Sequence, residues 1–178
     1  MRHCFRPIAR GALLAALVML PIPAQADALW QACQAGDSEA CLQGGAEAQA
    51  ADDVERMERF IRQGCELGNV ISCGDLGGRL LISGRNLARG LQLVTEGCEA
   101  GYGRACTNLG WALYSGIGVA SDPARAAGYY RIGCDKGSAP GCRNLGLMYA
   151  VGDGVALDTA LADRLFQRAC QLGARDVC

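Results

Sequence analysis

The sequence predicts an all-α fold built from repeated helical hairpins, and three observations carry this prediction. Ten of the eleven cysteines form five pairs, each eight residues apart, and successive pairs begin 32 to 36 residues apart. Such a period is typical of arrays in which each repeat is one helical hairpin. Glycine turns and helix-capping residues recur at the same places in the period. We therefore expect repeats at about 33–64, 65–97, 98–133 and 134–169, with a partial one at 170–178.

Residues 1–26 are expected to be a secretory signal peptide. Three arginines lie in the first ten residues, an apolar run follows, and Ala24-Gln25-Ala26 offers the small-x-small cleavage pattern. The run is too short to span a bilayer comfortably, and a retained N-terminal anchor is the alternative. Cleavage near Ala26 would leave residues 27–178 as a periplasmic or secreted repeat domain with no membrane segment. Its ten cysteines fit an oxidising compartment, where disulfides persist.

The composition of residues 27–178 excludes several classes of function. Removing residues 1–26 takes away three arginines and no acidic residue, so the formal net charge falls from −1 to −4. This balance gives no footprint for nucleic acid. The one histidine, His3, would leave with the signal peptide. Without it, most zinc hydrolases and every Ser-His-Asp or Cys-His mechanism are excluded, and we expect no metal, no cofactor and no assigned catalytic residue.

The first helix of each hairpin is clearest in the third and fourth repeats, which align without gaps. Helices are expected at about 106–115 and 142–151, each ended by a Gly-x-Gly turn that permits positive φ. Val119 and Val155 follow these turns, and we expect them to pack beneath the loop. A Leu-Gly step recurs in the first helix of repeats two to four, where the glycine would let two helices approach closely.

The second helix of each hairpin has a predicted start and a predicted apolar stripe. A capping residue stands twelve positions before the leading cysteine of a pair, namely Asp53, Asn86, Asp122 or Asp158. Apolar residues lie four and five positions before that cysteine: Phe60 and Ile61, Leu93 and Val94, Tyr129 and Tyr130, Leu165 and Phe166. This spacing favours a helix with one buried face.

Each cysteine pair is expected to form a disulfide between the end of one hairpin and the start of the next. The predicted pairs are Cys33–Cys41, Cys65–Cys73, Cys98–Cys106, Cys134–Cys142 and Cys170–Cys178. A short connection of seven residues can bring the two helix ends to the 5–6 Å that a disulfide needs between Cα atoms. Metal thiolates and redox cysteines are the alternatives. Metal sites favour separations of two to four residues, and no Cys-x-x-Cys occurs.

Residues 144–158 read Asn-Leu-Gly-x-x-Tyr-x-x-Gly-x-Gly-Val-x-x-Asp. At these residues the chain resembles the Sel-like repeats, relatives of the tetratricopeptide repeat. The cysteines eight apart make it similar to the secreted cysteine-rich branch, the Helicobacter cysteine-rich proteins. The resemblance covers residues 33–178. The third repeat departs from it by placing Leu113 where the tyrosine is expected, and the first repeat lacks the Leu-Gly step.

The resemblance implies a curved right-handed α-solenoid of about four repeats with a disulfide in each. It also implies three functions that conflict with one another. Most tetratricopeptide-like solenoids bind proteins or peptides in a concave groove. Some members of the cysteine-rich branch are described as penicillin-binding or as slow β-lactamases, and a mitochondrial relative is linked to haem handling in respiratory-complex assembly. A fold does not choose among functions.

We interpret the chain first as an exported scaffold that binds a protein or a peptide. A polar column stands two residues after the second cysteine of each pair, formed by Gln43, Asp75, Asn108 and Asn144. These side chains could hydrogen-bond an extended peptide, and Trp111 and Tyr114 would add an apolar contact. The alternatives are that the column satisfies local backbone groups and that the two aromatic residues pack within the fold.

Enzymatic and cofactor roles have weaker support in the residues. A serine β-lactamase needs Ser-x-x-Lys, but the one lysine after residue 26, Lys136, has Gly133 three positions before it. The neighbouring carboxylates Asp52/Asp53 and Glu55/Glu58 are candidates for acid–base work, although acidic residues at a helix start usually act as caps. A haem would need Met57, Met148, a tyrosine or a reduced cysteine as its axial ligand.

The last helix of the array is expected to have a weakly covered apolar flank. Repeat arrays usually need a polar capping element over their last apolar face, and the flank at 159–169 includes Leu161 and Leu165. We expect this end to dock a partner or a second copy of the chain.

Overall fold

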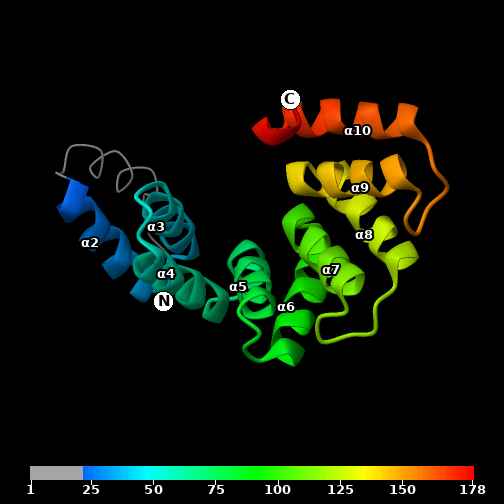
Figure 1. Ribbon diagram of the computed structural model, residues 1–178. Helices are drawn as coiled ribbons and strands as arrows, with labels where there is room; N and C mark the ends of the chain where they lie inside the picture. Colours follow the sequence, from blue (N-terminus) through cyan, green and yellow to red (C-terminus); the bar gives the residue numbers. More distant parts are fainter. Residues whose placement is uncertain (1–21) are drawn as a thin grey trace, which may run out of the picture. The chain divides into compact units, whose positions relative to one another are not determined.

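The computed structural model describes residues 22–178, with side chains from residue 27 onward. This part of the chain contains α-helices of thirteen residues each and no strand (Figure 1). The helices are α2 (Ile22–Gln34), α3 (Ser38–Ala50), α4 (Val54–Glu66), α5 (Val70–Ile82), α6 (Leu87–Glu99), α7 (Gly103–Ser115), α8 (Pro123–Asp135), α9 (Ala139–Val151) and α10 (Thr159–Gln171), followed by the 3-10 helix η1 (Arg175–Val177). None of these helices has the length and apolar character needed to cross a membrane.

The expected signal peptide lies mostly outside the described residues. Its last five residues belong to α2, which continues through the predicted cleavage position. The chain divides into two compact units, the first ending at Gln63 and the second comprising Gly64–Cys178. Each unit is described separately below.

The first unit packs α2, α3 and most of α4 around one aromatic side chain. Phe60 is 1 % exposed and lies in a cluster with Leu29, Cys33, Ala40 and Cys41. The Trp30 ring meets Phe60 edge to face, with 5.2 Å between the ring centroids, an arrangement favoured by the aromatic quadrupoles.

The second unit consists of three hairpins, α5–α6, α7–α8 and α9–α10 (Figure 1). We call α3, α5, α7 and α9 the A helices and α4, α6, α8 and α10 the B helices. In this unit α5 contacts α7 and α7 contacts α9, whereas α6 and α8 contact mainly the A helices beside them. The A helices therefore form the inner layer of the second unit, the side that repeat arrays use for binding.

The core of the second unit runs continuously through its hairpins. It includes Leu81, Val94, Leu109, Leu113 and Leu145, each less than a tenth exposed. Val119 and Val155 pack against this core from the hairpin loops, as predicted. The predicted caps are also present: Asp53, Asn86, Asp122 and Asp158 each accept a hydrogen bond from the backbone N–H three residues ahead.

Five disulfides join the pairs Cys33–Cys41, Cys65–Cys73, Cys98–Cys106, Cys134–Cys142 and Cys170–Cys178. Their Cα atoms are 4.4 to 5.2 Å apart, a separation that suits a disulfide. The predicted fold class, an all-α array of hairpins with one disulfide in each repeat, is confirmed.

The connections between hairpins are shorter than predicted. In the first four disulfides, the leading cysteine is the last but one residue of a helix and its partner is the fourth residue of the next. α7 and α9 thus begin three residues before the cysteines where we expected them to begin. Only three residues join the helices. The middle one is a glycine at positive φ, such as Gly137 at 85°, which allows so tight a turn.

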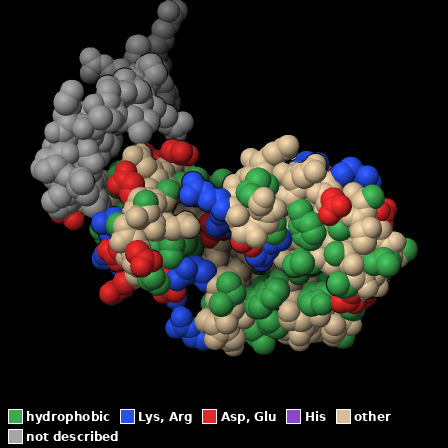
Figure 2. Space-filling view, turned by 45° about the horizontal axis from the view of Figure 1, so that its top comes forward, with side chains coloured by type: hydrophobic (Ala, Val, Ile, Leu, Met, Phe, Trp, Pro, Cys, Tyr) green, Lys and Arg blue, Asp and Glu red, His purple; other side chains and the backbone are tan. Residues whose placement is uncertain are grey.

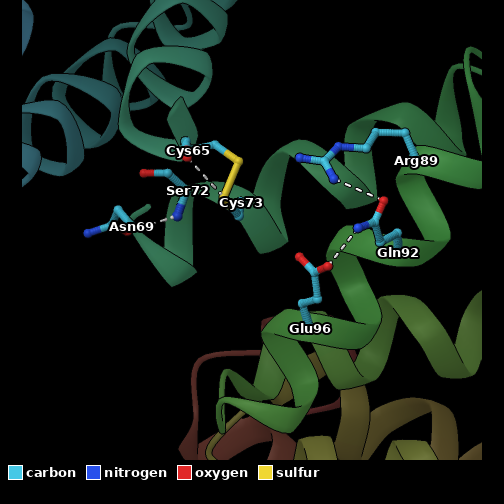
Figure 3. Close-up of a disulfide and its surroundings, with 7 residues drawn as sticks. All are labelled: Cys65, Asn69, Ser72, Cys73, Arg89, Gln92 and Glu96. Carbon is cyan, nitrogen blue, oxygen red and sulfur yellow. Dashed lines mark hydrogen bonds between the residues drawn. A yellow bond between two sulfur atoms is a disulfide. The ribbon is translucent and has the colours of Figure 1, made fainter. Parts of the chain in front are cut away.

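The connection between α4 and α5 shows this arrangement in detail (Figure 3). Asn69 caps α5 by accepting a hydrogen bond from Ser72 N at 3.0 Å, and Cys73 Sγ lies 3.3 Å from Cys65 O. On α6, Arg89 donates to Gln92 and Gln92 donates to Glu96, so polar side chains form a row along the exposed face of this helix.

The glycine of the Leu-Gly step does bring two helices together. A Cβ added to Gly110 would lie 2.9 Å from the Tyr130 ring, and one added to Gly146 would lie 2.7 Å from the Phe166 ring. The first repeat lacks this step, and its helices approach closely at another glycine. Gly44 takes the place of the leucine, and the Phe60 ring packs directly against it.

Candidate functional site

A pocket of about 180 Å³ opens on the second unit, between the hairpins α7–α8 and α9–α10. These are the third and fourth hairpins when the repeats are counted from the start of the array. Its walls come from the A helices α7 and α9, from the B helix α8 and from the loop after α9. The lining residues are Tyr114, Tyr130, Asn144, Leu147, Met148, Val151 and Asp153. The pocket is thus mostly apolar, with an amide, a carboxylate and two phenol hydroxyls, which is the usual make-up of a ligand site.

The rim of the pocket is apolar and exposed, while its floor belongs to the core. Val151 is 73 % exposed, Leu147 50 % and Tyr114 42 %, whereas Met148 is 4 % exposed. Figure 2 shows exposed hydrophobic side chains as patches on the surface of the second unit. Single exposed apolar residues are ordinary, but apolar residues clustered around a hollow are not, so the rim is an unusual feature of this surface.

One polar contact of the pocket lies between Tyr130 and Asn144. The Tyr130 ring is buried over Gly110, and its hydroxyl is hydrogen-bonded to the Asn144 side chain. Burial raises the pKa of Tyr130 to about 12, against the opposing effect of that hydrogen bond. The hydroxyl is therefore a neutral hydrogen-bonding group at physiological pH, and Tyr130 holds the Asn144 amide in place.

The second polar contact joins two repeats at the pocket mouth. Tyr114 Oη on α7 donates to Asp153 Oδ2 in the loop after α9 at 2.8 Å. The hydrogen bond to Asp153 and its negative charge raise the pKa of the Tyr114 hydroxyl. The Asp153 backbone N–H donates to Met148 O, and the flanking Gly152 and Gly154 have φ near 70°. The loop geometry therefore fixes where the carboxylate stands.

Of the six residues predicted to bind a ligand, two line the pocket. Asn144 and Tyr114 line the pocket, and Trp111 is half-buried against the core. Asn108 packs over Gly78 of α5. Asp75 accepts a hydrogen bond from Tyr102 at 2.7 Å and lies 3.9 Å from an Arg104 nitrogen.

The remaining member of the predicted column, Gln43, lies in the first unit and donates to Glu47. Burial, and to a smaller extent the contact with Asp75, raises the pKa of Tyr102. Gln43, Asp75 and Asn144 are thus engaged with neighbouring side chains, and Asn108 is the member of the column without a side-chain hydrogen bond among the described residues.

The sequence analysis missed five residues of the pocket: Tyr130, Leu147, Met148, Val151 and Asp153. Tyr130 was assigned to the core stripe, which is correct for its ring but overlooks its hydroxyl. A signal for Leu147 was available, because it occupies the same repeat position as Trp111. Asp153 is the one acidic residue among the two Gly-x-Gly turns, where the third repeat has Ile117.

The described residues offer little for the catalytic and haem alternatives. They contain no group of three His, Cys, Asp or Glu side chains arranged to hold a metal ion. Of the carboxylates considered for acid–base work, Asp53 caps α4 and also lies 3.9 Å from Arg56 Nε. Met148, considered as a haem ligand, packs in the core.

Comparison with known proteins identifies the repeat. The Sel1 repeat family model matches residues 103–138 and 139–173. No curated protein sequence matches the chain significantly. Among solved structures, cysteine-rich protein B of Helicobacter pylori is 30 % identical, with a TM-score of 0.57 over 71 % of this chain and 92 % of that one.

Two further structures share the fold at lower identity. A Sel1 repeat protein of Oxalobacter formigenes has a TM-score of 0.73 at 22 % identity over 86 % of this chain. A protective antigen of uropathogenic Escherichia coli that displays an SLR fold has a TM-score of 0.67 at 24 % identity, also over 86 %. This chain spans 64 % and 34 % of their lengths, respectively.

The predicted right-handed α-solenoid and the predicted resemblance are both confirmed by these matches. The disulfides and the likeness to the Helicobacter protein indicate an oxidising, extracellular environment. The chain is a disulfide-rich repeat scaffold and belongs to the Sel1 repeat family.

Proposed function

We propose that this chain is an exported scaffold that binds extended protein segments across the A helices of its second unit. The observation that carries the proposal is the pocket between α7 and α9, which is rimmed by Tyr114, Leu147 and Val151. Apolar side chains that remain exposed around a hollow gain free energy when a partner buries them, by about 25 cal/mol for each Å² of apolar surface.

The layout of the A helices suits an extended ligand. Packed helices are roughly 8–10 Å apart, and an extended chain advances about 3.3 Å per residue. Three residues of a peptide therefore span one helix, and a segment of six or seven residues would run from α5 across α7 to α9. A segment of this length could place one side chain in the pocket and its backbone over the neighbouring helix.

Asn108 supports a contact with such a backbone. Its amide is half-buried on α7 and has no hydrogen-bond partner among the described residues. It occupies the same repeat position as Asn144 in the pocket. A half-buried amide with free donors and an acceptor can pair with both groups of a peptide unit, so we assign Asn108 to the ligand backbone.

Export supports the same function. The predicted signal peptide, the predicted cleavage near Ala26 and the five disulfides would place the scaffold in the periplasm or outside the cell. There the disulfides persist, and the helices stay assembled without a large core.

Selection from a random peptide library tests this proposal. Peptides retained by the oxidised protein would be titrated against Leu147→Ser, and against Ile132→Ser as a matched control. Ile132 is 42 % exposed on α8, close to the 50 % of Leu147, but it does not line the pocket. We expect Leu147→Ser to weaken binding about five- to tenfold, the loss of one buried side chain, and Ile132→Ser to leave it unchanged.

Two outcomes would contradict the proposal. One is a library that yields no peptide bound above background, and the other is an equal affinity of both variants. Asn108→Ala tests the contact with the ligand backbone separately. It should weaken binding several-fold without lowering the melting temperature. An unaltered affinity would remove Asn108 from the site while leaving the pocket in place.

A further inference from the structure

The pocket carries a charge that the proposed peptide-binding function does not yet use. Asp153 is half-buried at the mouth, and its Oδ2 accepts the Tyr114 hydrogen bond. No arginine or lysine lines the pocket, and Asp153 makes no ion pair with any residue of the described chain. The pocket therefore presents one carboxylate, with no cation of its own to balance it.

The apolar part of the pocket sets the size of what enters. Its volume of about 180 Å³ is slightly more than the roughly 150 Å³ of a cavity that holds a benzene ring. One leucine, isoleucine, valine or methionine side chain fills this space between Leu147, Met148 and Val151. A longer apolar stretch would not fit. Successive side chains of an extended segment point to opposite faces, so the side chain two positions from the inserted one lies at the mouth.

The mouth is where Asp153 and Tyr114 meet. A guanidinium or ammonium group there would pair with the carboxylate and would lie beside the Tyr114 ring, which attracts cations through its quadrupole. An acidic residue at the same place would face a like charge. Resting on the proposed peptide-binding function, we propose that the pocket selects segments in which an aliphatic side chain stands two positions from an arginine or lysine, so that both face the scaffold.

The third repeat indicates that this charge is not part of the fold. Its loop has the same course, with Gly116 and Gly118 at φ near 70°, yet Ile117 replaces the aspartate and packs against the core. The hairpin therefore forms without a carboxylate at this position. Selectivity for a basic side chain is accordingly expected at the pocket of the fourth hairpin and not along the whole array.

Three pools of ten-residue synthetic peptides test the selectivity. All pools share one alanine–serine–threonine background. The first carries an aliphatic residue two positions from arginine or lysine, and the second an aliphatic residue two positions from aspartate or glutamate. The third carries glutamine two positions from arginine or lysine. We expect the oxidised protein to retain the first pool about two- to fivefold more than the second, the range of a partly exposed ion pair. The third pool should bind least, and added salt should narrow the preference.

Asp153→Asn isolates the charge, because the amide oxygen can still accept the Tyr114 hydrogen bond. It should make the first and second pools bind equally. Asp163→Asn is the matched control: it removes the same charge from an exposed position on α10 that does not line the pocket. This variant should keep the preference. Leu147→Ser should weaken the first two pools together.

The outcomes separate the inference from the function on which it rests. Equal retention of the first and second pools, or a preference that survives Asp153→Asn, overturns the basic selectivity and leaves peptide binding standing. An equal effect of Asp163→Asn would show that only net charge matters, and would also overturn it. If no pool binds above background, or if Leu147→Ser has no effect, the peptide-binding pocket itself is wrong.

Discussion

The third and fourth hairpins have nearly the same backbone, but they carry different side chains at the positions that build the pocket. Both A helices end at a glycine with φ near 70°, and both B helices begin at a capping aspartate. Yet Tyr130 stands where the next hairpin has Phe166, and Ile117 stands where it has Asp153. The backbone is set by glycines, caps and disulfides, so the remaining positions are free to build a site.

The disulfides that follow the two hairpins differ in burial, and removing them should give the largest effect. Cys134 and Cys142 are 2 % and 0 % exposed, whereas Cys178 is exposed and Cys170 half-buried. Closing such a short loop stabilises by about 2–3 kcal/mol on the entropic model. We expect Cys134→Ala/Cys142→Ala to cost about 3 kcal/mol and Cys170→Ala/Cys178→Ala clearly less, by denaturant unfolding. Equal costs would show that burial of the sulfur atoms adds nothing.

The next largest difference in stability between the two hairpins is expected from substituting the glycines of the Leu-Gly step. A Cβ at Gly110 would meet both the Tyr130 ring and Ala126 O at 3.2 Å, whereas the three atoms nearest to one at Gly146 all belong to the Phe166 ring. Phe166 is half-buried in the last helix and can shift outward, but a backbone carbonyl cannot. We expect Gly110→Ala to cost about 2 kcal/mol and Gly146→Ala about half as much, measured by thermal unfolding.

Gly128 supplies the control for both glycine variants. It lies in α8 with no atom within 4 Å of an added Cβ, so Gly128→Ala should stabilise by several tenths of a kcal/mol through helix propensity. A destabilising Gly128→Ala would mean that glycine variants report on something other than close packing.

A further small destabilisation is expected from removing the Tyr130 hydroxyl. Tyr130→Phe gives the third hairpin the aromatic residue of the fourth and loses one hydrogen bond, which costs about 1 kcal/mol. Because burial raises the pKa of Tyr130 from 10.0 to about 12, its contribution is fully present below pH 10 and falls as the pH rises toward 12. The melting temperature should therefore drop less between pH 9 and pH 11 in the variant than in the parent. Parallel curves would contradict the assignment.

Much of this fold could be predicted because its signals are local in the sequence. The cysteine spacing, Asp122 and Asp158 as caps and Gly146 as a close-packing site each act within one repeat, and the structure bears them out. The first repeat was harder, because Gly44 and Phe60 replace a leucine by packing that only the folded chain reveals.

The pocket could not be predicted in the same way, because its contacts join different repeats. Tyr114 and Asp153 are 39 residues apart, and neither a helical period nor a spacing rule relates them. The predicted polar column included Asn144, which lines the pocket. It gave Asp75 the same role, although that carboxylate is engaged by the Tyr102 hydroxyl. Chemically similar residues at one repeat position therefore need the identity of their neighbours before a role can be given.

The sulfur bridges cross the joints between hairpins and leave the inside of each hairpin unbridged. Within the second unit, the spacing between successive A helices is thus fixed before any partner arrives, and a bound segment would not have to order the scaffold. Such preorganisation lowers the entropic cost of association. It also means that a reductant would act on affinity before it acted on helix content, because each hairpin would keep its own packing while the pitch of the array was released.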